Sequence, residues 1–290
     1  DGVGETRLRT PHARRRREGL GEAPEGGQGH GQAGRDDELL GRHRPDILVA
    51  LADQAQRGPQ LADHRRRDRR RQRPAGRLAD DLVEDIKLLL HSLQIRKLSM
   101  LGCSIGGGIA MKFAAKYPEY TEKIILCSSI GPNGVPVYKT NEQGAPTKSR
   151  AETEEEVLED CGVKAMRETI LEQDREKAWL LIISLFFTGR KEPSAERMEQ
   201  FVDDFLKCKA VGDMHFAMNK FSVKLDSIKC KVLLMYGGQD MLVKKEDREN
   251  MMKGLGDLAE LKVFEGAGHM ILEDCPEEFV KCVQDFLCKE

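Results

Sequence analysis

Several residue patterns are missing from this sequence, and each absence argues against a class of protein. The chain has no run of about 18 or more apolar residues, which excludes a membrane-spanning helix. No charged segment followed by an apolar stretch opens it, so we expect no secretory signal. None of the eight cysteines falls in a CxxC pair, and no histidine cluster accompanies them at zinc-ligand spacing. We therefore expect no bound metal, free thiols and a reducing compartment, the cytoplasm.

The first 77 residues also lack whole residue types. They contain no Lys, Ser, Asn, Met or Cys and no aromatic residue. They hold 18 Arg against 12 acidic residues, a balance of +6, whereas residues 78–290 have a balance of −8. Only Ile47–Leu51 forms an apolar run, so these residues have little from which to build a core. We expect residues 1–77 to be an Arg-rich segment without an ordered fold.

Two interpretations of residues 1–77 remain open. The basic run His64–Arg73 is typical of a disordered arm that binds nucleic acid or serves as a nuclear signal. The excess of Arg, Gly, Ala, Pro and Gln is also what a GC-rich coding region gives when it is translated out of frame. We favour the second interpretation and expect no nucleic-acid partner.

From residue 78 onward the apolar pattern predicts alternating helices and strands. The expected elements are helix 78–93, strand 97–103, helix 105–117, strand 123–128, strand 231–236, helix 244–252, strand 261–265 and helix 276–287. Strand, helix and strand in succession require a parallel sheet. Helical patterns over 153–167, 169–187 and 194–208, with a loop over 141–148, interrupt this alternation. The sequence thus predicts an α/β fold with a mostly parallel, doubly wound sheet, a core of 78–130 and 226–290, and a helical insertion of 131–225.

The best-defined motif is a glycine-flanked serine between a predicted strand and a predicted helix. Gly102-Cys103-Ser104-Ile105-Gly106 matches G-x-S-x-G, in which neighbouring glycines let a strand turn sharply into a helix. Ser104 would sit at the helix N-terminus, where the N–H of Ile105 could stabilise an oxyanion. We predict Ser104 as the nucleophile. Cys103, whose side chain should point away from the turn, is expected to be a packed residue.

A serine nucleophile needs a base, and the base needs a carboxylate that orients it. Asp240 follows the strand 231–236 on a loop, whereas the residues just after the strand 123–128 offer no carboxylate. His269 follows the strand 261–265 and completes the chain order Ser, Asp, His. His91 and His215 fall on helical patterns and are not expected to be catalytic. The sequence predicts a triad of Ser104, Asp240 and His269.

These motifs carry a family likeness. Gly102–Gly108, Gly237–Asp240 and Gly266–His269 with its continuation MILEDCPEEF resemble α/β-hydrolases of the cap-bearing esterase and lipase-like branch. The resemblance covers about residues 78–290 and implies an eight-stranded, mostly parallel sheet with a helical cap over residues 131–225. Members of the family also carry a His-Gly loop after an early strand, which supplies a second oxyanion donor. That loop should fall within residues 1–77, where Gly29-His30-Gly31 is a candidate without a strand before it.

The resemblance implies a serine hydrolase that acts on a carboxylic ester or related acyl substrate through an acyl-enzyme intermediate. Neither cofactor nor metal is implied, and the expected partner is the small-molecule substrate. A C–C bond hydrolase, a lactonase or a cofactor-free perhydrolase would use the same fold, because function lies in the pocket. A non-catalytic binding protein on this fold is the alternative from another class.

Overall fold

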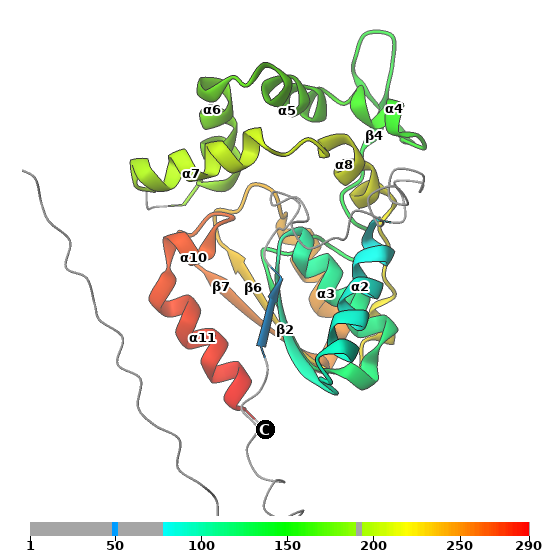
Figure 1. The fold of residues 1–290 in the computed structure, drawn as a ribbon, viewed down its shortest axis with the longest axis vertical. Helices are drawn as coiled ribbons and strands as arrows, with labels where there is room; N and C mark the ends of the chain where they lie inside the picture. Colours follow the sequence, from blue (N-terminus) through cyan, green and yellow to red (C-terminus); the bar gives the residue numbers. More distant parts are fainter. Residues whose placement is uncertain (1–47, 52–77, 190–192, 290) are drawn as a thin grey trace, which may run out of the picture. The chain divides into compact units, whose positions relative to one another are not determined.

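The computed structural model describes residues 48–51, 78–189 and 193–289 (Figure 1). All of them belong to one compact unit, Pro45–Glu290. The candidate oxyanion loop at 29–31 and the basic run at 64–73 lie outside the described residues. Residues 48–51 are described by their backbone alone.

The centre of this unit is a parallel sheet with strand order β1-β2-β3-β6-β7. Its strands are β1 (Leu48–Leu51), β2 (Leu98–Cys103), β3 (Thr121–Cys127), β6 (Lys231–Gly237) and β7 (Ala259–Phe264). Four of them lie where the apolar runs predict strands. The expected α/β class is confirmed, and the carboxyl ends of all five strands meet at one edge of the sheet.

The eight strands that the resemblance implies stay a prediction, because residues 1–47 and 52–77 lie outside the described part of the chain. The described residues contribute five strands to the sheet. The first of these, β1, lies in a segment for which the composition predicts no order. Its backbone pairs with β2 from Leu48 opposite Ser99 to Leu51 opposite Gly102. The physical reason is that a four-residue apolar run becomes a strand when a neighbouring strand satisfies its backbone hydrogen bonds.

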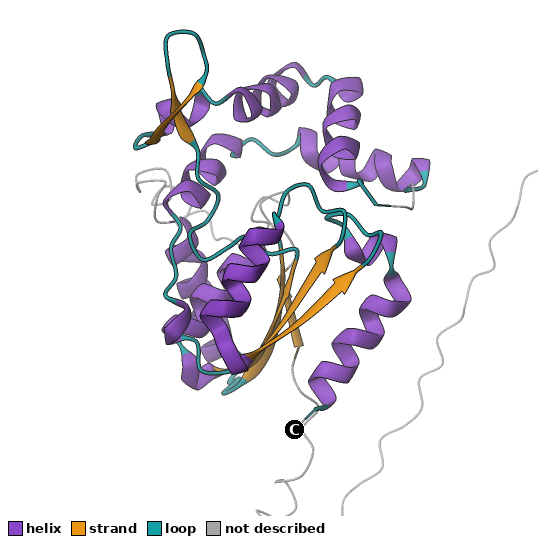
Figure 2. Ribbon diagram, turned by 180° about the vertical axis from the view of Figure 1, so that it is seen from behind, coloured by secondary structure: helices purple, strands orange, loops and turns teal. Residues whose placement is uncertain are grey.

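Helices cover both faces of the sheet, because buried strands alternate apolar side chains between the two faces. One face packs on α2 (Leu78–Ser92), α3 (Ile105–Lys116) and α9 (Lys245–Leu255). The other face packs on α11 (Pro276–Cys288), as Figures 1 and 2 show. Ile124 and Leu126 of β3 point to the first cluster, and Ile125 between them points to the second. This doubly covered arrangement leaves the carboxyl edge of the sheet for a site.

The insertion between β3 and β6 contains a short antiparallel hairpin and then five helices. Its elements are β4 (Tyr138–Thr140), β5 (Pro146–Arg150), α4 (Glu154–Leu158), α5 (Cys161–Glu172), α6 (Arg175–Phe186), α7 (Ala195–Leu206) and α8 (Val211–Lys220). The hairpin corrects the expected loop over 141–148. The expected helix over 153–167 is broken as well, because the Asp160 side chain accepts hydrogen bonds from the N–H groups of Gly162 and Val163 and starts a new helix.

Much of the insertion has an apolar core of its own, in which Ile182, Met198 and Val202 are almost fully buried. A further short helix, α10 (Ile271–Asp274), precedes α11, and single 3-10 turns occupy Pro118–Tyr120, Leu225–Ser227 and Gly256–Leu258. In the described part of the chain, no helix is both long and apolar enough to cross a bilayer.

Candidate active site

Ser104 joins β2 to α3 through a strained backbone conformation. Its φ of 52° and ψ of −118° lie where residues with a side chain are rarely found, at a cost of about 1–3 kcal/mol. Two hydrogen bonds from neighbouring elements hold it there. Its N–H donates to Cys127 O at 2.9 Å, and its carbonyl accepts from Ile130 N–H at 3.2 Å. Strand β3 and the loop that follows it thus fix the turn despite the strain.

Glycine at position 102 has a steric reason. A Cβ on Gly102 would lie 2.3 Å from the carbonyl oxygen of Gly106 and 2.6 Å from the backbone nitrogen of Gly107. Backbone atoms at the start of α3 cannot yield as a flexible side chain would. The close approach of helix and strand therefore explains this part of the G-x-S-x-G pattern.

Asp240 and His269 form a buried hydrogen-bonded pair. The Nδ1–H of His269 donates to Asp240 Oδ2 at 3.0 Å, and the two side chains are 4% and 0% exposed. The other carboxylate oxygen, Oδ1, accepts from the N–H groups of Leu242 at 2.8 Å and Val243 at 3.1 Å. Burial by itself would raise the pKa of Asp240, but the His269 hydrogen bond and these N–H groups together hold it below its ordinary value. The carboxylate is therefore ionised near neutral pH and orients the imidazole.

The opposite nitrogen of the imidazole, Nε2, is buried and has no hydrogen-bond partner among the described residues. The phenyl ring of Phe186 lies against the imidazole, with ring centroids 5.6 Å apart. Ser104, Asp240 and His269 follow β2, β6 and β7, so they share one edge of the sheet. The structure brings Asp240 and His269 into contact, but it contains no hydrogen bond between His269 and the Ser104 hydroxyl.

The remaining residues considered from the sequence lie as follows. Ile105 is the first residue of α3. Cys103 is half-buried and lies opposite Cys127 in the sheet. The pKa of the Cys127 thiol is raised, mainly by its hydrogen bond with Cys103 and also by burial. His91 is exposed near the end of α2. His215 lies 2.7 Å from Val211 O within α8, and burial lowers its pKa.

The sequence did not indicate which residues support the loop that carries the histidine. Gly268 N–H donates to Asp274 Oδ2 at 2.8 Å, which ties the turn before His269 to α10. Met270 N–H donates to Phe186 O at 3.3 Å and so connects the same loop to the insertion. Asp274 lies in the MILEDCPEEF continuation, but nothing in its spacing indicated this contact.

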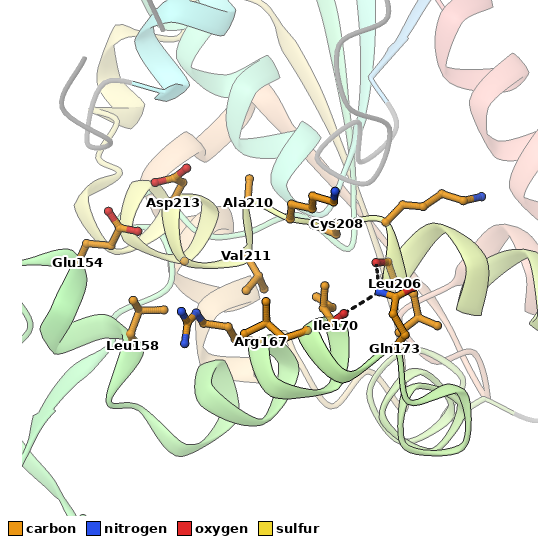
Figure 3. A pocket seen from close by; sticks show the side chains of 14 residues that line it. Glu154, Leu158, Arg167, Ile170, Gln173, Leu206, Cys208, Ala210, Val211 and Asp213 are labelled. Carbon is orange, nitrogen blue, oxygen red and sulfur yellow. Dashed lines mark hydrogen bonds between the residues drawn. The ribbon is translucent and has the colours of Figure 1, made fainter. Parts of the chain in front are cut away.

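A separate pocket of about 690 Å³ lies within the insertion, between α4, α5 and the connection from α7 to α8 (Figure 3). Apolar side chains such as Ile170 and Val211 line it together with charged ones such as Arg167 and Asp213. None of Ser104, Asp240 and His269 lines it. Across the described ranges, no cluster of three His, Cys, Asp or Glu side chains is placed to hold a metal ion.

Comparison with known proteins agrees with this fold. A family model described as serine aminopeptidase, S33, matches residues 69–276. The AB hydrolase superfamily protein YisY of Bacillus subtilis is 23% identical over 212 residues, which cover 71% of this chain and 72% of that protein. The 2-hydroxy-6-oxo-6-phenylhexa-2,4-dienoate hydrolase of Comamonas testosteroni is 27% identical over 210 residues, 70% of this chain and 66% of the relative.

Solved structures show the same fold. An esterase from Exiguobacterium antarcticum superposes with a TM-score of 0.59 at 20% identity, over 84% of this chain and 92% of the esterase. The 2-hydroxy-6-oxo-6-phenylhexa-2,4-dienoate hydrolase of Rhodococcus sp. strain RHA1 superposes with a TM-score of 0.55 at 18% identity, over 73% and 71% of the two chains.

Proposed function

Since the chain belongs to the α/β-hydrolase family matched by the serine aminopeptidase, S33, model, we propose that it is a serine hydrolase of a carboxylic ester or related acyl compound. The observation that carries the proposal is the buried Asp240–His269 pair, whose Nε2 is unpartnered among the described residues. This pair shares a sheet edge with the strained Ser104. A buried nitrogen without a hydrogen-bond partner costs free energy in a protein that makes no use of it. A catalytic base, in contrast, needs such a free nitrogen to accept a proton.

In the proposed reaction Ser104 Oγ attacks the acyl carbonyl carbon while His269 Nε2 takes the hydroxyl proton. Asp240 holds the Nδ1–H tautomer and stabilises the imidazolium that forms. The N–H of Ile105 stabilises the developing oxyanion. The imidazolium then protonates the leaving alcohol, and a water molecule, deprotonated by His269, hydrolyses the acyl-enzyme to release the acid.

In this proposal the insertion, as a cap, would shape the substrate pocket. Its half-buried aromatic Phe186, beside the imidazole, would exclude water from the reacting groups. The eight cysteines form no disulfide among the described residues. This is compatible with the cytoplasm as the compartment, which stays a prediction.

A fluorophosphonate probe tests the proposal directly, because it phosphonylates a serine activated by a neighbouring base. We expect the wild-type protein to be labelled at Ser104 and the Ser104→Ala and His269→Gln variants to remain unlabelled. Ser129, a buried serine whose hydroxyl donates to the carbonyl of Ile130, offers a control through Ser129→Ala. A folded wild-type protein that resists labelling would favour the non-catalytic binding protein instead.

C–C bond hydrolysis is the second candidate, favoured by the activity for which the Comamonas testosteroni relative is named. Parallel assays with p-nitrophenyl esters of increasing acyl length and with 2-hydroxy-6-oxo-6-phenylhexa-2,4-dienoate distinguish the two. Turnover of the dienoate with a kcat/KM well above that of every ester would replace the ester proposal, while Ser104→Ala should abolish either activity.

A further inference from the structure

Thr188, just beyond the end of α6, touches the two loops that carry the proposed acid and base. Its Oγ1–H donates to the carbonyl of Gln239, the residue before Asp240, at 2.8 Å. It also packs on Gly268, the residue before His269, so closely that a Cβ there would lie 2.7 Å from Thr188 Oγ1. A single half-buried side chain of the insertion thus contacts the chain on the N-terminal side of both residues.

The two loops also contact each other, and Thr188 adds to that connection. Gln239 N–H donates to Ala267 O at 2.9 Å. The backbone of Gln239 therefore bonds to the histidine loop through its N–H and to Thr188 through its carbonyl. A Cβ on Gly237 would lie 2.0 Å from Gly268 O, which shows how closely the loops pass. Loops packed this closely transmit a shift of one to the other.

A third contact comes from the same segment of the insertion. The carbonyl of Phe186, two residues before Thr188, accepts from Met270 N–H directly after His269. His269 is therefore flanked on both sides by the segment 186–189, and Asp240 is held through Gln239. These contacts span about fifty to eighty residues of sequence.

We infer that Thr188 is a positioning residue, through which the insertion sets the distance and angle between the Asp240 and His269 side chains. The inference rests on the proposed function only for its effect on rate, since the effect on the pair itself needs no substrate. A loss of about 1 Å in positioning costs on the order of 10²-fold in rate.

The test compares three variants of the full chain. Thr188→Val removes the hydroxyl at nearly constant shape, and Thr188→Ser keeps it. Ser184→Ala removes an α6 hydroxyl that donates to Leu181 O of its own helix. The first readout is the downfield proton NMR resonance of His269 Nδ1–H, assigned by its absence in His269→Gln. The second is the rate constant of fluorophosphonate labelling, together with kcat and KM for an ester.

We expect Thr188→Val to broaden or shift the Nδ1–H resonance and to slow labelling about 10- to 100-fold, through kcat more than KM. Thr188→Ser and Ser184→Ala should stay within a few-fold of wild type. Should Thr188→Val fail to fold, Thr188→Cys replaces it, because a thiol is a weaker donor of similar size.

Folded Thr188→Val or Thr188→Cys protein with an unchanged resonance overturns the inference, even if the wild type is labelled normally. An unlabelled wild type whose resonance is present and disturbed by Thr188→Val refutes the hydrolase proposal but supports Thr188 as a positioning residue. The two failures are therefore distinguishable.

Discussion

The ring of Phe186 lies 5.6 Å from the imidazole of His269, centroid to centroid, with 53° between the ring planes. Phe186 thus covers the imidazole of a residue that is only 5% exposed. We expect Phe186→Ala to open the imidazole to solvent, because alanine cannot fill the same space. Carbethoxylation of His269 by diethyl pyrocarbonate, followed by peptide mass spectrometry, should then proceed several-fold faster.

The matched control for this change is Phe201→Ala. Phe201 packs edge-on against Phe187 at 5.1 Å and leaves the Phe186–His269 contact in place. An equal acceleration in both variants would mean that the insertion loosens as a whole, and the shielding role of Phe186 would be wrong.

The strained backbone of Ser104 predicts a stabilising substitution that destroys the site. Glycine adopts a φ of 52° without strain, whereas serine adopts it at a cost in free energy. Ser104→Gly should therefore have a free energy of unfolding about 0.5–2 kcal/mol higher than that of Ser104→Ala. Urea denaturation of both variants measures the difference. Alanine is the proper reference because it lacks the hydroxyl but keeps the Cβ. If Ser104→Gly were the less stable variant, the strain would not be relieved at this position.

The features that could be predicted are those determined by residues close together in the sequence. Strand β3 and helix α2 carry their own apolar periodicity, and both form within about two residues of the predicted bounds. The α4–α5 break was missed because helical spacing continues through Asp160, whose capping role depends on one side-chain geometry. The β4–β5 hairpin was missed because all five side chains of Pro146–Arg150 are exposed and give no alternation.

The same distinction applies to the candidate site. Ser104, Asp240 and His269 could be proposed because each follows a predicted strand of a parallel sheet, and such positions converge at one edge. The contacts of Phe186 and Thr188 could not, because they join the insertion to loops far along the chain and have no spacing rule. The missing Ser104–His269 hydrogen bond was not foreseeable either, since motifs specify residues and not interatomic distances.

Steric limits at the serine turn predict that Gly102→Ala is severely damaging. The added methyl carbon would lie 2.3 Å from Gly106 O, so α3 must move or the turn must open. We expect a destabilisation of at least about 1–3 kcal/mol and loss of fluorophosphonate labelling. Gly131→Ala is the control, because nothing lies within 4 Å of its Cβ position and its φ is not positive. Similar denaturation midpoints for the two variants would contradict the close approach of helix and strand.

The pKa of Asp240 predicts how the protein responds to acid. In the folded chain this pKa lies below the ordinary value of 3.8: burial raises it, but the hydrogen bond from His269 and the N–H groups of Leu242 and Val243 more than offset that effect. The unfolded chain therefore binds the proton more tightly, and the ionised carboxylate stabilises the fold above about pH 4. That contribution is lost as the pH falls through the folded pKa. Asp240→Asn lacks it, so its free energy of unfolding should fall less steeply between pH 5 and pH 2.

Urea denaturation of wild type and Asp240→Asn at half-unit pH intervals measures this difference. Asp285→Asn is a suitable control, because Asp285 is an exposed partner of Lys281 on α11 and an exposed ion pair contributes little. At neutral pH the same Asp240→Asn variant should lose on the order of 10⁴-fold in kcat, because an amide no longer selects the Nδ1–H tautomer. A variant with the wild-type acid slope would show that the carboxylate is not stabilised by its contacts. A variant with near-normal kcat would show that His269 needs no orientation by residue 240.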